Sequence, residues 1–216
     1  MNKILVLIGA PGAGKGTQAR KLSEHFGIPH ISTGDMFREM KTLDTPLARE
    51  VRETMAAGKL ISDDLTFQIV RQRTSREDCK NGYLLDGYPR TAVQARQLEQ
   101  LALEQGKDIL AIEIFVPKEE LTKRLTGRRS CPICGEIYNI YSKPPVNDNV
   151  CDHHPEARLL QREDDNEASV ATRLATFEEM TRPLIDYYSE HGRLKSIDGT
   201  QSAEAVFDEI VKAVGG

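Results

Sequence analysis

The sequence has no surplus of positive charge. Its 216 residues include 29 Lys and Arg against 33 Asp and Glu, which gives a net charge of −4. A protein that binds nucleic acid generally needs a strongly basic face, so this balance argues against that class. With 39% hydrophobic and 29% charged residues, the composition is that of an ordinary soluble globular protein. Its length allows one good-sized core with room for inserted lobes.

Long apolar runs are also missing. The run Ile4-Leu5-Val6-Leu7-Ile8 is shorter than the apolar core of a signal peptide and lacks a following cleavage site of small residues. No other stretch approaches the roughly 20 apolar residues of a membrane span. We therefore expect a cytoplasmic protein that does not contact a membrane. The four cysteines are then more often metal ligands or free thiols than disulfides.

A glycine-rich loop with a lysine follows the first apolar run and leads into a helical pattern that ends at Phe26. The loop reads Gly9-Ala10-Pro11-Gly12-Ala13-Gly14-Lys15-Gly16-Thr17. A buried strand, such a loop and a helix N-terminus together form a cradle for nucleotide phosphates. The usual pattern places Ser or Thr directly after the lysine, whereas here Gly16 intervenes. A structural glycine turn and a dinucleotide loop fit less well, because a lysine occupies the loop and no G-x-G-x-x-G frame is present.

Five apolar stretches alternate with helical patterns and predict the strands of one sheet, at residues 4–8, 30–32, 83–86, 109–116 and 194–197. This alternation predicts a P-loop α/β fold, a doubly wound parallel five-stranded sheet with helices on both faces. Three local features are also predicted. Ser62 caps a helix that begins at residue 63, Thr91-x-x-Gln94 forms a capping box, and one long helix spans 167–190 with at most a local break at Pro183.

Charged residues at the ends of the predicted elements suggest phosphate chemistry. Asp86 ends a buried strand, where the carboxylate on the Mg²⁺ side of a phosphate-loop site lies, although a strand-end Asp can also cap the next turn. Phosphoryl transfer needs charged substrates held in line and their oxygen charge neutralised, which guanidinium groups supply. A single surface arginine is more often solvated or ion-paired, so the interpretation rests on the whole set: Arg38, Arg90, Arg124, Arg128, Arg129, Arg162 and Arg173.

Between residues 127 and 165 the composition changes to Cys, Pro, Asn and Tyr, which indicates an inserted lobe. The spacing of Cys131, Cys134, Cys151 and His154 is that of a zinc ribbon and predicts a closed, structural zinc site. His153 or Asp152 could replace His154, and cysteines without a metal are the remaining alternative. A nucleic-acid-binding ribbon is disfavoured, because residues 131–167 contain eight acidic and three basic residues.

Seven motifs in one order resemble the adenylate kinases of the long-lid bacterial type, over essentially the whole chain. They are Gly9-x-Pro-Gly-x-Gly-Lys-Gly-Thr17, Ser32-Thr-Gly-Asp-Met-Phe-Arg38, Gly58-Lys-Leu-Ile61, Asp86-Gly-Tyr-Pro-Arg90 with Gln94, Gly127-Arg-Arg129, Arg162-x-Asp-Asp165 and Asp198-Gly-Thr200. The resemblance implies a monomeric enzyme that catalyses ATP + AMP ⇌ 2 ADP with Mg²⁺. Relatives with a metal in the lid often have Cys or Asp as the fourth ligand, so His154 departs from their pattern.

The resemblance also assigns regions and residues. It implies a core of residues 1–31, 62–126 and 166–216, an AMP-binding helical lobe at 32–61 and a zinc-binding lid at 127–165. ATP would contact Gly12, Ala13, Gly14, Lys15, Gly16, Thr17, Arg128, Ile137, Tyr138 and Gln201. AMP would contact Thr33, Arg38, Lys59, Leu60, Ile61, Gly87, Tyr88, Pro89, Arg90, Gln94, Arg162 and Arg173. The catalytic charges would be those of Lys15, Arg38, Arg90, Arg124, Arg128, Arg162 and Arg173.

Two other functions remain open from the sequence. A UMP or CMP kinase would share the fold and the mechanism, because the choice of base depends on few groups, Thr33 and Gln94 among them. A non-enzymatic nucleotide-binding switch would share the phosphate loop. A GTPase switch, however, needs Asn-Lys-x-Asp after a later strand, and Asn-Lys occurs here only at residues 2–3.

Overall fold

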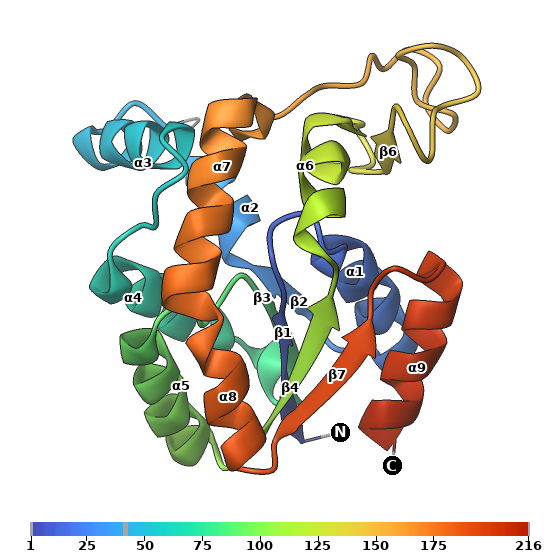
Figure 1. Ribbon diagram of the computed structural model, residues 1–216. Coiled ribbons are helices and arrows are strands. Elements are labelled where there is room, and N and C mark those ends of the chain that lie inside the picture. The colour runs from blue at the N-terminus through green and yellow to red at the C-terminus, as the bar shows by residue number, and fades with distance from the viewer. Residues whose placement is uncertain (1, 41–42, 216) are drawn as a thin grey trace.

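The computed structural model describes residues 2–40 and 43–215. Its centre is a five-stranded parallel sheet in the order β2-β3-β1-β4-β7 (Figure 1). The strands are β1 (Lys3–Ile8), β2 (His30–Ser32), β3 (Tyr83–Asp86), β4 (Asp108–Phe115) and β7 (Leu194–Asp198). The predicted fold class is confirmed, and each of the five predicted strands lies within two residues of the expected bounds.

Both faces of the sheet are buried, which explains why its strands are continuous apolar runs. In β1, Leu5 and Leu7 face one core and Ile4, Val6 and Ile8 face the other. The first core is completed by α1 (Lys15–Phe26), α6 (Lys118–Thr126), α7 (Glu167–Thr176) and α9 (Ala203–Gly215). The second is completed by α4 (Asp63–Thr74), α5 (Ala92–Gln105) and α8 (Pro183–Glu190), which Figure 1 shows on the opposite side from α1 and α9.

Two segments extend beyond these layers, at the end of the sheet where the strands terminate (Figure 1). The first carries α2 (Thr33–Met40) and α3 (Pro46–Ala56). The second contains a small antiparallel pair, β5 (Arg128–Ser130) with β6 (Ile137–Asn139), and otherwise loops and a short helix, Glu163–Asp165. Its buried cluster consists of five residues, two of which are cysteines: Cys131, Tyr138, Cys151, Ala157 and Leu159.

One local expectation needs correction. Ser62 precedes α4, but its side chain makes no capping hydrogen bond. The helix α2 begins directly after β2, and the Ser32 hydroxyl accepts the N–H of Asp35 in its first turn at 3.2 Å.

The long helix expected over 167–190 is present with one local irregularity, directly before Pro183. Phe177–Thr181 forms a π-helical turn, which is closed by a 2.8 Å bond from Arg182 N–H to the Phe177 carbonyl. A short helix, Glu77–Cys79, lies between α4 and β3. Within the described ranges, no helix is both long enough and apolar enough to cross a membrane.

Candidate functional site

A cleft of about 1410 Å³ opens where the parallel strands end, which is where α/β sheets bind ligands. It is bordered by the glycine loop after β1, by α2, by residues 58–61, by the loop after β3 and by the inserted segment at 127–165. Almost all of the nucleotide-site residues predicted from the sequence line this cleft. Ala13 and Tyr88 do not: their side chains are buried in the two cores, so only their backbone could meet a ligand.

The glycine loop presents unused backbone donors to the cleft. Gly12 and Gly14 have φ angles of 89° and 95°, a left-handed conformation that glycine adopts without strain. The N–H groups of Gly14, Lys15 and Gly16 donate to no residue in the described part of the chain. Three free donors at the N-terminus of α1 form a binding site for an anion.

Lys15 lies at the base of this loop. Its ammonium group donates to the carbonyls of Gly9, at 2.6 Å, and Ala10, at 3.1 Å. Burial lowers the pKa of Lys15 to about 8, with help from the positive charges of Arg90, Arg173 and Arg128, while Asp86 opposes the shift. An anion that approaches this lysine would therefore raise its pKa and favour its charged form.

Asp86 faces Lys15 from the end of β3. A Cβ atom on Gly16 would lie 3.6 Å from Asp86 Oδ2, so the carboxylate is beside the start of α1. His30 Nε2 is 3.6 Å from the same oxygen. Burial alone would raise the pKa of Asp86, but His30, Lys15 and Arg90 outweigh it and hold the pKa below its usual range. The carboxylate is thus kept charged beside the phosphate loop, where a divalent cation would need it.

The loop after β3 forms the opposite wall. Gly87 has a φ of 82°, and the peptide bond between Tyr88 and Pro89 is cis. The Gly87 carbonyl accepts both the Thr33 hydroxyl, at 2.9 Å, and Arg90 Nε, at 2.8 Å. A side chain at position 87 would come within 2.8 Å of both groups, so a glycine there lets the arginine lie flat against the loop. Burial lowers the pKa of Arg90, and the nearby Arg173 and Arg38 lower it further against the opposing charge of Asp86.

The predicted capping box is half right. The Thr91 hydroxyl accepts the N–H of Gln94 at 3.1 Å, as expected for the N-terminus of α5. The Gln94 side chain does not return to Thr91 but accepts the N–H of Arg90 at 2.8 Å, one residue earlier. Gln94 therefore supports the backbone of the arginine loop and also borders the cleft.

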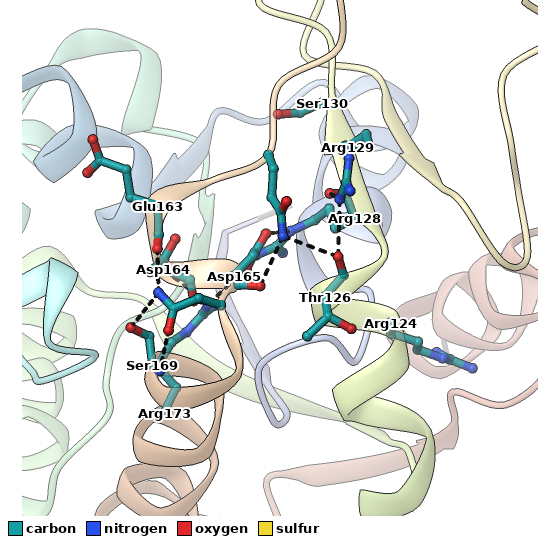
Figure 2. Close-up of polar contacts among 12 residues, drawn as sticks. Arg124, Thr126, Arg128, Arg129, Ser130, Glu163, Asp164, Asp165, Ser169 and Arg173 are labelled. Carbon is teal, nitrogen blue, oxygen red and sulfur yellow. Dashed lines mark hydrogen bonds and ion pairs between the residues drawn. The ribbon is translucent and has the colours of Figure 1, made fainter. Parts of the chain in front are cut away.

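One buried carboxylate holds two of the arginines together (Figure 2). Asp165, whose side chain is fully buried, accepts Nε and Nη2 of Arg128 at 2.8 and 2.5 Å and Nη1 of Arg173 at 3.0 Å. Asp164 adds a second carboxylate contact to Arg173, at 3.1 Å. In the sequence, the motif at 162–165 had drawn attention to its arginine, and the structural role of Asp165 was not found.

Two other arginines border the cleft but differ in their partners. The guanidinium group of Arg162 makes no hydrogen bond or ion pair with the residues that the structure describes; burial, aided by Arg128 and Arg38, lowers its pKa to about 10. Arg38 is paired with Asp35 on its own helix, α2. An arginine without a carboxylate partner is available to an anionic ligand. Among the residues described, Arg162 is such an arginine, and so is Arg90, whose guanidinium group donates to the Gly87 carbonyl.

Arg124 and Arg129 point elsewhere. Arg124 donates to the Gly199 carbonyl at 3.1 Å and to Glu120 at 3.0 Å, and Figure 2 shows it turned away from Asp165. Its predicted catalytic role stays a prediction, although it still borders the cleft. Arg129 donates to the carbonyls of Thr126 and Arg128, so its guanidinium group supports the base of the inserted segment.

The predicted metal ligands converge in the inserted segment. The ligand atoms of Cys131, Cys134, Cys151 and His154 all lie within 4.8 Å of one another. The Cys134–Cys151 sulfur distance and the distance from Cys151 Sγ to His154 Nδ1 are both 3.8 Å. Four ligands about 2.3 Å from a central ion in a tetrahedron would be about 3.8 Å apart, so these donors fit zinc.

The surroundings of this cluster favour His154 over the two alternatives. Asp152 accepts the N–H of Val146 at 2.8 Å, and neither it nor His153 joins the cluster of described ligand atoms. The Ile133 N–H donates to Cys131 Sγ at 3.4 Å, and Tyr138, almost fully buried, places its hydroxyl 3.6 Å from Cys151 Sγ. Such contacts to the ligand atoms orient them for a metal.

Comparisons with known proteins agree on one family. The family model described as adenylate kinase matches residues 7–193. The adenylate kinase of Caldanaerobacter subterraneus subsp. tengcongensis is 49% identical over 213 residues, which cover 98% of this chain and 96% of the relative. Those of Thermotoga petrophila and Bacillus licheniformis are 46% and 48% identical over 217 and 213 residues, which cover 100% and 98% of this chain and 98% of each relative.

The arrangement around Asp165 predicts an unequal effect of two neighbouring substitutions. Asp165→Asn leaves Arg128 and Arg173 without their shared buried carboxylate, and we expect it to lower the free energy of unfolding by about 3 kcal/mol. Asp164→Asn is the matched control: Arg173 keeps Asp165 and the Asp164 carbonyl, so we expect a loss below about 1 kcal/mol. Urea unfolding of both variants measures the difference, and equal losses would contradict the prediction.

Proposed function

The chain belongs to the adenylate kinase family, and from this membership we propose how its cleft is divided between two nucleotides. The reaction is a reversible phosphoryl transfer, ATP + AMP ⇌ 2 ADP, for which adenylate kinases use Mg²⁺ with ATP. The observation that carries the proposal is that two loops with groups that can bind phosphate face each other across one cleft. One wall is the loop of free N–H donors with Lys15, and the other is the loop that holds Arg90.

We propose that ATP occupies the side of the glycine loop. Its phosphates would accept the free N–H groups at the start of α1, and Lys15 would leave the carbonyls of Gly9 and Ala10 to reach them. Asp86 would bind Mg²⁺ either directly or through a water molecule on the cation. The groups proposed to contact ATP are Gly12, Ala13, Gly14, Lys15, Gly16, Thr17, Arg128, Ile137, Tyr138 and Gln201. Arg124, which donates to the Gly199 carbonyl in this structure, would assist at the transferred phosphoryl group.

AMP would occupy the opposite wall. Its phosphate would meet Arg38 and Arg90, and its base would lie between Thr33, residues 59–61 and Gln94, with Gly87, Tyr88 and Pro89 forming the floor. Arg162 and Arg173 would lie between the two nucleotides. The guanidinium group of Arg162 has no ion-pair partner in the described chain, so it needs to break no ion pair to bind the transferred group.

Catalysis in this proposal is electrostatic. The transferred phosphoryl group spreads negative charge over its equatorial oxygens, so positioned donors stabilise it without a general base. Lys15, Arg38, Arg90, Arg128, Arg162 and Arg173 supply the positive charges. Asp165 fixes the directions of Arg128 and Arg173 before the substrates arrive, which removes part of the cost of reorganisation.

We also propose that residues 32–61 and 127–165 act as lobes that close over AMP and ATP. Closure excludes water, which would otherwise compete for the phosphoryl group. Every proposed contact comes from a single chain, so the enzyme would work as a monomer; we propose a cytoplasmic location for it, with no nucleic acid or membrane partner.

A panel of phosphoryl acceptors tests the division of the cleft. Purified protein with MgATP is given AMP, GMP, CMP or UMP, and ADP formation is followed. We expect a strong preference for AMP. Preference for UMP or CMP would keep the mechanism but remove the proposed base contacts, and transfer to none of them would favour a nucleotide-binding switch.

Proton uptake tests the role of Lys15. With a pKa of about 8, Lys15 is about half protonated at pH 8, whereas at pH 6.5 it is almost fully protonated. Phosphates raise its pKa, so MgATP binding should take up about half a proton at pH 8 and almost none at pH 6.5. Calorimetry in two buffers of different ionisation enthalpy measures this number. In Lys15→Arg, which stays charged at both pH values, the uptake should vanish; undiminished uptake would exclude Lys15 as its source.

We propose that Cys131, Cys134, Cys151 and His154 hold a structural zinc ion. The lobe has a buried cluster of only five residues, so the metal would supply the stability that apolar burial does not. Elemental analysis of the purified protein should find about one zinc per chain. Cys134→Ser should lose the metal and expose the lid to proteolysis, while Cys79→Ser, outside the cluster, should keep it. A metal-free wild-type protein with a protease-resistant lid would contradict the assignment.

A further inference from the structure

The side-chain amide of Gln94 is held at both of its polar atoms. Its Oε1 accepts the backbone N–H of Arg90 at 2.8 Å, and its Nε2 donates to Oδ1 of Asp63, also at 2.8 Å. The same Asp63 oxygen accepts the hydroxyl of Thr91 at 3.0 Å. The amide is almost fully buried at the border of the cleft, so water does not replace these partners.

These partners determine which way the amide faces. A backbone N–H can only donate and an ionised carboxylate can only accept, so the oxygen of Gln94 must face Arg90 and its nitrogen must face Asp63. A flipped amide would set its NH₂ group against the Arg90 N–H and its oxygen against the Asp63 carboxylate. Both hydrogen bonds would be replaced by repulsive contacts.

A fixed amide offers its remaining groups in a fixed order. One lone pair on Oε1 and one N–H on Nε2 are left, and an amide with this pair can read a purine edge. Adenine presents an N6 donor and an N1 acceptor on its Watson–Crick edge. Hypoxanthine and guanine present the reverse, an O6 acceptor and an N1–H donor. An amide that suits one edge must flip to suit the other.

We propose that Asp63 determines nucleobase specificity by locking the Gln94 amide in the orientation that accepts adenine. The proposal rests on the proposed function, which places the AMP base against Gln94. Asp63 is the first residue of α4 and Thr91 precedes α5, so the lock is built on core helices outside residues 32–61. It would therefore keep its geometry when the AMP-binding lobe moves.

The test compares AMP with IMP. IMP differs from AMP at position 6 and in the proton on N1, and unlike GMP it has no 2-amino group. In Asp63→Asn, the residue at position 63 no longer has to accept, so one of the two contacts that oppose a flip of the Gln94 amide is removed and only the Arg90 N–H still opposes it. We expect the ratio of kcat/KM for AMP to that for IMP to fall at least tenfold. The change should lie in the KM values of the two monophosphates, with kcat at saturation and the KM for ATP unchanged.

Asp64→Asn is the matched control. Asp64 is the other acidic residue in the first turn of α4, is exposed and makes no bond to Gln94, so its substitution removes the same charge from the helix end. Its AMP/IMP ratio should equal that of the wild type. An unchanged ratio in Asp63→Asn would overturn the proposal, as would an equal loss of activity toward both monophosphates.

Gln94→Leu separates the two levels of inference. If it abolishes the discrimination while Asp63→Asn does not, the lock is wrong and the base site stands. If Gln94→Leu leaves the ratio unchanged, the proposed base site fails as well. Should Asp63→Asn fold poorly, the wild-type protein supplies a second measurement: the lock requires the side-chain NH₂ protons of Gln94 to exchange slowly with water, and rapid exchange would overturn it.

Discussion

Like charges held at close range are the constraint on which this cleft depends. Arg90, Arg128, Arg162 and Arg173 surround one space with Lys15, and their mutual repulsion contributes to the lowered pKa values of Lys15, Arg90 and Arg162. Asp165, whose side chain is fully buried, offsets part of that repulsion. Asp86 and Asp164 offset more of it, but the positive groups around the cleft still outnumber these carboxylates. In the proposed function, two nucleotides would supply negative charge here, so the repulsion among the cationic side chains would favour their binding.

The same ion pair joins the two ends of the inserted segment. Arg128 begins β5 just after the first boundary of the inserted segment, and Asp165 closes it at the second, 37 residues later. The carboxylate that orients Arg128 and Arg173 therefore also ties this segment to α7, from which Arg173 projects (Figure 2). If the segment closes as the proposed lid, a pivot at these residues would keep Arg128 aimed at the phosphates.

Local signals in the sequence predicted the layers well. The five strands are short apolar runs buried on both faces, and the glycine loop follows one of them directly, so neighbouring residues carry all the information needed. Local signals also misled. Ser62 has the residue type of a cap but makes no capping bond, whereas Ser32, the last residue of β2 as predicted, also accepts the N–H of Asp35 in the first turn of α2. The π-helical turn at 177–181 coincides with a bond from Thr181 to the Arg90 carbonyl, a partner 91 residues away.

The groups that sequence reasoning missed act through long-range pairs. Asp63 and Gln94 are 31 residues apart, and nothing near either residue indicates that they meet. Gln94 was predicted either to cap its helix or to read the base, as if the two roles competed. In the structure, its oxygen supports the Arg90 backbone while its nitrogen is held by Asp63, and one N–H and one lone pair remain for the cleft. The local bond to Arg90 and the long-range bond to Asp63 together fix the amide, and a fixed amide can distinguish bases that a freely rotating one would accept equally.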